Sequence, residues 1–332
     1  MPQSAAEIPV HTIQRKAAII NAAARDYAGS VSVRPMSHFD LDRTIFSTLE
    51  GTLPRLVMQA RLAKEPTWKD SIAQLIEDDY QELSQQEPLP EVDPLLLRFL
   101  QEECDFDVEH ADGSFLDHLY FCYEYGIHHY PTRSPLILLL HSILGTGTNT
   151  FAMEAHKIPT LQSLVSEFEW THVAAFPSVL RLLYGDTLRK ELRANLHRLD
   201  KLDGVRFHRV IDNAPLEMSA EDFWVQLNFQ LIHLVDFLPV SNWVVHANDT
   251  AFIVFRDLFD LLDRAGRMEA ELDYTPARGP RSVQDEELSF ITWLSSWIPN
   301  TISEKMAARS VCRFSERIGH SMDYELMWRA GA

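Results

Sequence analysis

The sequence predicts an all-α fold. Glycine is scarce, with 12 residues in 332, whereas sandwiches, barrels and glycine-rich nucleotide-binding folds need many tight turns. Several segments begin with a residue that can cap a helix and end at glycine or proline, which is the pattern of helix boundaries. Only residues 205–210 and 243–246 resemble short strands, and we expect no sheet from them.

The first 90 residues are expected to form a helical extension. Helices are predicted near 14–27, over 40–62 and from Thr67, a plausible N-cap, to Leu83. The stretch QQEPLPEVDP that follows is acidic and interrupted by prolines, which is typical of a connector between structural units. We therefore place a boundary near residue 90.

Two helices are predicted after this boundary. The first should run from Ser114, its N-cap, to about His129. The next begins at Pro135, because proline is favoured at the first position of a helix. The run Leu136–Leu140 leaves this helix no polar face, which indicates a central, fully buried helix that stops at Gly145.

Three further helices complete the middle of the chain. One should begin at Pro159 and be broken near Pro177, since proline cannot donate a backbone hydrogen bond. Ser219 is expected to cap a helix over 223–238, and another should cover 251–264.

This pattern divides the chain into an N-terminal helical extension, a helical core and a C-terminal helical extension. Their predicted bounds are residues 1–90, 91–265 and 266–332. The proline- and glycine-bearing loop YTPARGPRS leads into the last of them, which should hold a pair of helices.

Composition and charge indicate a soluble, cytoplasmic protein. The formal net charge of −18 repels nucleic acid phosphates and anionic membrane surfaces. Three cysteines lack metal-ligand spacing, and their odd number argues against a disulfide framework. We see no apolar stretch typical of a signal peptide and no apolar run long enough to cross a bilayer. We expect no binding to nucleic acids or membranes.

Histidine is concentrated in the middle of the chain. Seven of the 14 histidines lie between residues 110 and 172, in less than a fifth of the sequence. Neutral imidazole is a common ligand for transition metals, so a metal pocket is one interpretation of this cluster. The alternative is that one or two are hydrogen-bonded core histidines and the others lie at the surface.

His118 and His141 are the most informative pair. His118 lies one turn into its predicted helix, and His141 ends the buried apolar run. A histidine after five consecutive aliphatic residues is costly unless both ring nitrogens have partners. A metal ion and one hydrogen-bond acceptor would satisfy both, and the negative end of the helix dipole would favour the cation. The alternative partner is a backbone carbonyl, Ser142 or Thr146.

The segments HADGSFLDHL and LILLLHSILGTGTN resemble the first half of the HD-domain superfamily. Those all-helical metalloenzymes carry a histidine on one helix and a His-Asp pair at the end of an apolar helix. The resemblance is closer still to uncharacterised helical proteins in which the pair reads His-Ser and is followed by Gly-Thr. It implies an HD-like helical core with metal ligands at His118 and His141.

One departure from the superfamily concerns the metal count. Ser142 stands where the superfamily has its metal-bridging aspartate, and a hydroxyl is a poor bridge between two cations. The resemblance places the last ligand on a later helix, where Asp236 is the candidate; the alternative is that Asp236 accepts hydrogen bonds from buried donors. His172 is a further candidate as ligand or catalytic group. His110 is expected to close the pocket or act in acid–base chemistry.

Two histidines and one carboxylate with open positions form the ligand set of mononuclear iron oxygenases. Some HD-type enzymes carry out oxygen chemistry, and the resemblance implies the same here. The sequence therefore narrowly favours a non-haem Fe(II) oxygenase acting on a small-molecule substrate. A zinc or manganese hydrolase on the same residues is an alternative. A degenerate HD-like protein that binds a ligand or partner without catalysis is another.

Overall fold

Helices make up most of the described structure, and a small antiparallel sheet packs against them. The computed structural model describes residues 92–104, 109–110, 113–114, 119, 122–123, 125–127, 129–145, 153–235, 250–272, 294 and 297–329. The helix-rich composition agrees with the sequence analysis, but the sheet does not. The helices predicted within residues 14–83 and the strand at 243–246 lie outside the described residues.

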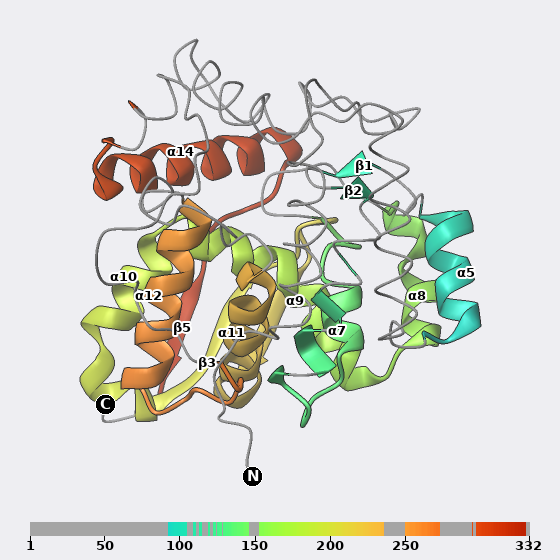
Figure 1. Ribbon diagram of the computed structural model, residues 1–332, viewed down its shortest axis with the longest axis horizontal. Helices are drawn as coiled ribbons and strands as arrows, with labels where there is room; N and C mark the ends of the chain where they lie inside the picture. Colours follow the sequence, from blue (N-terminus) through green and yellow to red (C-terminus); the bar gives the residue numbers. More distant parts are fainter. Residues whose placement is uncertain are drawn as a thin grey trace, which may run out of the picture.

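The described helices are α5 (Pro94–Glu103), α7 (Leu136–Leu139), α8 (Ile158–Leu164), α9 (Glu167–Tyr184), α10 (Thr187–Ala194), α11 (Ala220–Val235), α12 (Thr250–Arg264) and α14 (Asn300–Ile318). The strands are β1 (Glu109–His110), β2 (Gly113–Ser114), β3 (Leu202–His208), β4 (Pro215–Ser219) and β5 (Glu325–Trp328). In chain order, the described part begins with α5, the short β1–β2 pair and short helices, continues with the long helix α9, α10 and the β3–β4 hairpin, and ends with α11, α12, α14 and the strand β5 (Figure 1).

The apolar run around α7 is buried as predicted, although its helix is short. All residues from 137 to 145 are buried, but α7 itself spans only Leu136–Leu139. The next N–H groups bond to carbonyls three residues back, for example Gly145 N to Ser142 O at 3.1 Å, so the chain continues as tight turns. A four-residue helix has little dipole at its end, so that part of the argument for a cation at His141 falls away.

The long helix predicted from Pro159 is two helices. α8 ends at Leu164, and Ser166 begins α9 with a capping box. In this box the Ser166 hydroxyl accepts from Glu169 N at 3.3 Å and Ser166 N donates to the Glu169 carboxylate at 2.7 Å. Pro177 lies inside α9 without ending it. Residues on all sides of this turn are buried, so packing offsets the hydrogen bond that proline cannot donate.

The two later helices begin where the sequence predicts. The Ser219 hydroxyl accepts a hydrogen bond from Asp222 N at 3.1 Å and caps α11. α12 covers Thr250–Arg264. The last predicted residues of the α11 helix, 236–238, lie outside the described residues.

The sheet joins segments that are far apart in the sequence. β3 lies between β4 and β5, and both pairings are antiparallel. Val205 of β3 is opposite Met218 of β4 on one side and opposite Leu326 of β5 on the other. The predicted strand at 205–210 therefore exists, but the prediction of no sheet is wrong, because a partner strand comes from the far end of the chain.

α9 and α11 lie side by side near the centre of the molecule (Figure 1), and α9 contributes to both clusters of buried apolar side chains. The larger cluster combines α9, α10, α11, α12 and the sheet, and the smaller one combines α5, the α7 region, α8 and the start of α9. α14 packs on α9 and α12. The C-terminal elements α14 and β5 therefore pack directly on the helices and sheet of residues 153–264.

A series of hydrogen bonds joins the end of α14 to β3 and α9. The Arg181 guanidinium donates to the Ser315 hydroxyl at 3.1 Å, and His320 Nδ1 lies 3.4 Å from the same hydroxyl. His320 Nε2 lies 3.0 Å from the carbonyl oxygen of His208, so it carries the proton that is donated there. Burial lowers the pKa of His320 to about 4, against the raising effect of this hydrogen bond.

We expect His320 to make folding stability depend on pH. Its pKa is about 4 in the folded protein and about 6.5 in the unfolded chain. The unfolded state therefore binds the extra proton between these values, so the contribution is complete above about pH 6.5 and is lost as pH falls toward 4. Between pH 7.5 and 5 the wild type should lose about 2 kcal/mol more than His320→Gln. Urea unfolding at both pH values measures this; equal losses would contradict it.

Candidate metal centre

The structure describes the side chains of two of the five predicted site residues, His141 and His172. Only the backbone of His110, in β1, is described. His118 and Asp236 lie outside the described residues, so their predicted roles as metal ligands stay predictions.

His141 forms a contact with a second histidine, His233, in the last turn of α11. The centroids of the two imidazole rings lie 4.3 Å apart, with an angle of 57° between the ring planes. Both side chains are buried, with exposed fractions of 1% and 3%. Phe176 of α9 packs against both rings, at centroid distances of 5.1 Å and 5.4 Å. Three separate segments of the chain thus bring two imidazoles together in the core.

The hydrogen bond of His141 determines which of its ring nitrogens carries the proton. Its Nδ1 lies 2.6 Å from the carbonyl oxygen of Leu138. A carbonyl only accepts, so Nδ1 carries the proton, and Nε2 of the neutral ring holds a lone pair. Metal-bound histidines commonly donate their other N–H to a carbonyl in this way, which fixes the orientation of the ring. The carbonyl partner and the metal, treated above as alternatives, are therefore compatible.

His233 is the residue that the sequence analysis missed as a candidate ligand. It lies three positions before Asp236, a spacing that puts both on one side wherever a helix continues. The available signal was a polar stripe, Gln226, Gln230 and His233, at helical spacing in a segment whose only other polar residue is Asn228. Only the tertiary structure shows that its last member meets His141.

His172 is fully buried one turn before Phe176 on α9. Its Nδ1 lies 2.9 Å from Gln226 Oε1, and its Nε2 lies 3.8 Å from a carboxylate oxygen of Asp222. The ring also packs on Phe168 and Phe229. Burial lowers the pKa of His172, so the imidazole is neutral near pH 7.

His141 and His233 together would offer a metal two nitrogen ligands. Among them, no group of three or more His, Cys, Asp or Glu side chains has the geometry to hold an ion. A metal at His141 and His233 therefore needs a further protein ligand from outside the described residues, where His118 and Asp236 lie. The pair is compatible with transition metals, which favour imidazole nitrogen, and unsuited to Mg²⁺ or Ca²⁺, which favour oxygen.

Comparison of the chain with protein-family models, curated proteins and solved structures gave no match. In the described part of the chain, no helix has both the length and the apolar character to cross a bilayer. A function for the candidate centre must therefore be argued from its own side chains.

Proposed function

We propose that this protein is a metal-dependent enzyme for a small-molecule substrate, with an HD-like core that holds one transition metal between His141 and His233. The observation that carries the proposal is the contact of these two buried rings, 4.3 Å between centroids. Because Nδ1 of His141 bonds to the carbonyl oxygen of Leu138, Nε2 is the nitrogen through which His141 would bind the metal.

The ligand set that we propose is His118, His141, His233 and Asp236, of which the sequence analysis named all but His233. A metal bound there would supply a Lewis acid and, if it is Fe(II), a site for oxygen. We favour Fe(II) oxidation over Zn or Mn hydrolysis, because Ser142 supplies no negative charge between two cations. Its side chain is 4% exposed and follows His141 directly.

The chain's own groups would shield and orient the reacting molecules. Phe176 covers both imidazoles and limits the access of water, which strengthens every polar contact at the pair. Leu138 O holds the His141 ring in one tautomer. We propose His172, neutral near pH 7, as the group that would accept or return a proton, with His110 as the second candidate for this role.

Metal analysis of the purified protein tests the proposal and its metal count. After anaerobic loading with excess Fe(II) and desalting, we expect at most one tightly bound equivalent per chain. Two cations about 3.5–4 Å apart repel strongly without an anionic bridge. Ser142→Asp should raise the capacity toward two. The asparagine of Ser142→Asn has the size of aspartate but no charge, so this variant should still bind only one metal per chain.

Three outcomes would contradict parts of the proposal. Two equivalents in the wild type would mean that another carboxylate bridges two metals, and the single-metal assignment would fail. Equal capacity in Ser142→Asp and Ser142→Asn would refute the role given to this position. No bound metal in any of the three proteins would favour the non-catalytic, ligand- or partner-binding alternative.

A further inference from the structure

A line of polar side chains runs along α11 through the core. Asp222, Gln226, Gln230 and His233 are spaced by four, four and three residues, which places them on one face of the helix. Asp222 is 37% exposed at its side chain, whereas both glutamines are fully buried. The line therefore begins at the surface and ends at the histidine pair.

This polar face packs against α9. Gln226 contacts His172, with Oε1 2.9 Å from Nδ1, and Gln230 Nε2 donates to the carbonyl oxygen of Phe176 at 2.9 Å. The contacts advance along both helices together, so α9 and α11 run in the same direction. Figure 1 shows the two helices side by side at the centre of the molecule.

Three buried polar atoms of His172 and the two glutamines find no hydrogen-bond partner among the described residues. They are His172 Nε2, Gln226 Nε2 and Gln230 Oε1. Exchanging the nitrogen and oxygen of Gln226 does not remove the problem. Nε2 would then face His172 Nδ1, and Oε1 would be the atom without a partner. Exchanging those of Gln230 would set an oxygen against the Phe176 carbonyl. No choice of side-chain assignment satisfies all three atoms.

Such atoms are rare in folded proteins because each one forfeits the hydrogen bond that water provides in the unfolded chain. Three together would remove a large part of the stability of an ordinary domain. Buried water is the common solution where two or more polar atoms converge. Gln226 Nε2 is a donor and Gln230 Oε1 is an acceptor one helical turn away, so a water between them can accept from one and donate to the other.

We propose that His172, Gln226 and Gln230 bind internal water molecules that connect Asp222 to the His141–His233 pair. The 3.8 Å between His172 Nε2 and the Asp222 carboxylate exceeds a direct hydrogen bond and suits a bridging water. The line then provides a route along which protons pass between solvent and the buried pair. This role rests on the proposed function, whereas the water sites do not.

A double-mutant cycle on the two glutamines tests the water sites without any substrate. Methionine has nearly the shape of glutamine, so Gln226→Met and Gln230→Met remove the amides and keep the packing. If one water joins the amides, the two effects on the unfolding equilibrium constant should depart from additivity by about fivefold or more. Pairing Gln226→Met with Gln162→Met, at an exposed site on α8, should give additive effects.

Oxygen-17 relaxation dispersion on the metal-free protein counts long-lived internal waters directly. The double variant Gln226→Met/Gln230→Met should hold fewer of them than the wild type. Additive effects together with an unchanged water count would overturn the proposal. Coupled glutamines and lost waters in a protein that binds no metal would leave the water sites standing and refute the proposed function. Bound metal together with additive effects of the two glutamines and an unchanged water count would refute the water sites and leave the proposed function standing.

Discussion

Replacing His141 or His233 should lower the affinity for Fe(II) by at least about 100-fold. Loss of a group that merely orients a metal ligand already costs about 10–100-fold, and these residues are proposed as ligands themselves. Alanine at a buried position also leaves a cavity worth about 2–4 kcal/mol. His141→Asn is therefore the sharper variant, because its side-chain amide can still donate to Leu138 O while it lacks Nε2.

The matched control is His172→Asn. His172 is equally buried, but its described contacts are with Gln226, Asp222 and two phenylalanines rather than with the histidine pair. We expect the His172→Asn variant to bind Fe(II) with the affinity of the wild type. Titration with Fe(II) under anaerobic conditions, with circular dichroism to verify folding, measures both. Full affinity in folded His141→Asn and His233→Ala would remove the assignment.

His118→Ala and Asp236→Ala should also lose metal if these residues complete the ligand set. Their side chains lie outside the described residues, so this measurement tests the sequence-based assignment by itself. If both retain metal, the resemblance to HD-type ligands fails while the His141–His233 pair stands.

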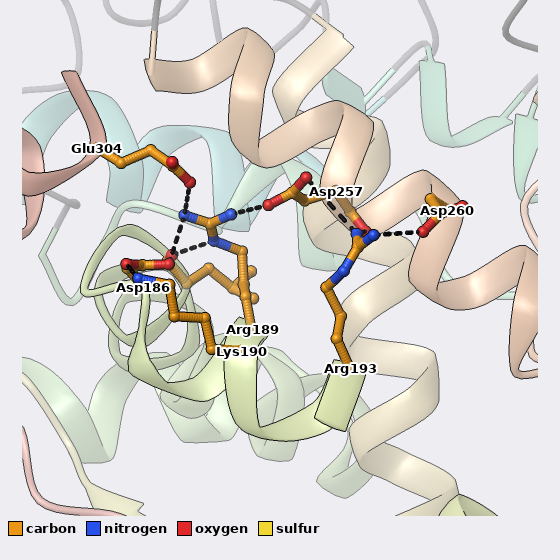
Figure 2. Close-up of polar contacts among 8 residues, drawn as sticks. Asp186, Arg189, Lys190, Arg193, Asp257, Asp260 and Glu304 are labelled. Atoms are coloured by element: carbon orange, nitrogen blue, oxygen red, sulfur yellow. Dashed lines mark hydrogen bonds and ion pairs between the residues drawn. The ribbon is translucent and has the colours of Figure 1, made fainter. Parts of the chain in front are cut away.

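Replacing Arg189 with methionine should lower the free energy of unfolding by about 3–5 kcal/mol. Its side chain is 2% exposed and joins α10 to α12 and α14 (Figure 2). The guanidinium pairs with Asp257, with Glu304 at 3.2 Å and with Asp186 at 3.5 Å, and Nε donates to Leu183 O at 2.7 Å. Methionine would leave partly buried carboxylates facing one another with no cation between them.

The neighbouring Arg193 provides the control for this prediction. It pairs with Asp260 at 2.7 Å and with Asp257 at 3.5 Å (Figure 2), but its side chain is 34% exposed. Ion pairs in contact with solvent contribute about 0–1 kcal/mol, so Arg193→Met should cost no more than that. Urea unfolding of both variants decides the matter. Equal effects would mean that burial of the Arg189 network contributes nothing beyond its packing.

Local signals in the sequence determined where α11 and α12 begin, but they misplaced other helix limits: α7 ends at Leu139, α8 and α9 are separate helices, and Ser114 lies in β2 rather than at a helix start. Ser219 caps α11 through an N–H only three residues away, and α12 begins at Thr250, within one residue of the predicted start. Burial of residues 137–145 also follows from composition, because a segment that is apolar except for His141, Ser142 and a glycine gains most by leaving water. His141 was identified as a constrained histidine for the same reason.

Tertiary structure alone decided the sheet, the histidine pair and the Arg189 network. β5 pairs with β3 across more than a hundred residues, and His233 meets His141 only because α11 packs against α9 and the α7 region. Arg189 pairs with carboxylates from α12, from α14 and from Asp186, the residue before α10. The physical reason is the separation in sequence between the interacting residues. Helix caps and burial depend on neighbours within one turn or on the side chain itself. A pair of buried imidazoles depends on where distant segments are held.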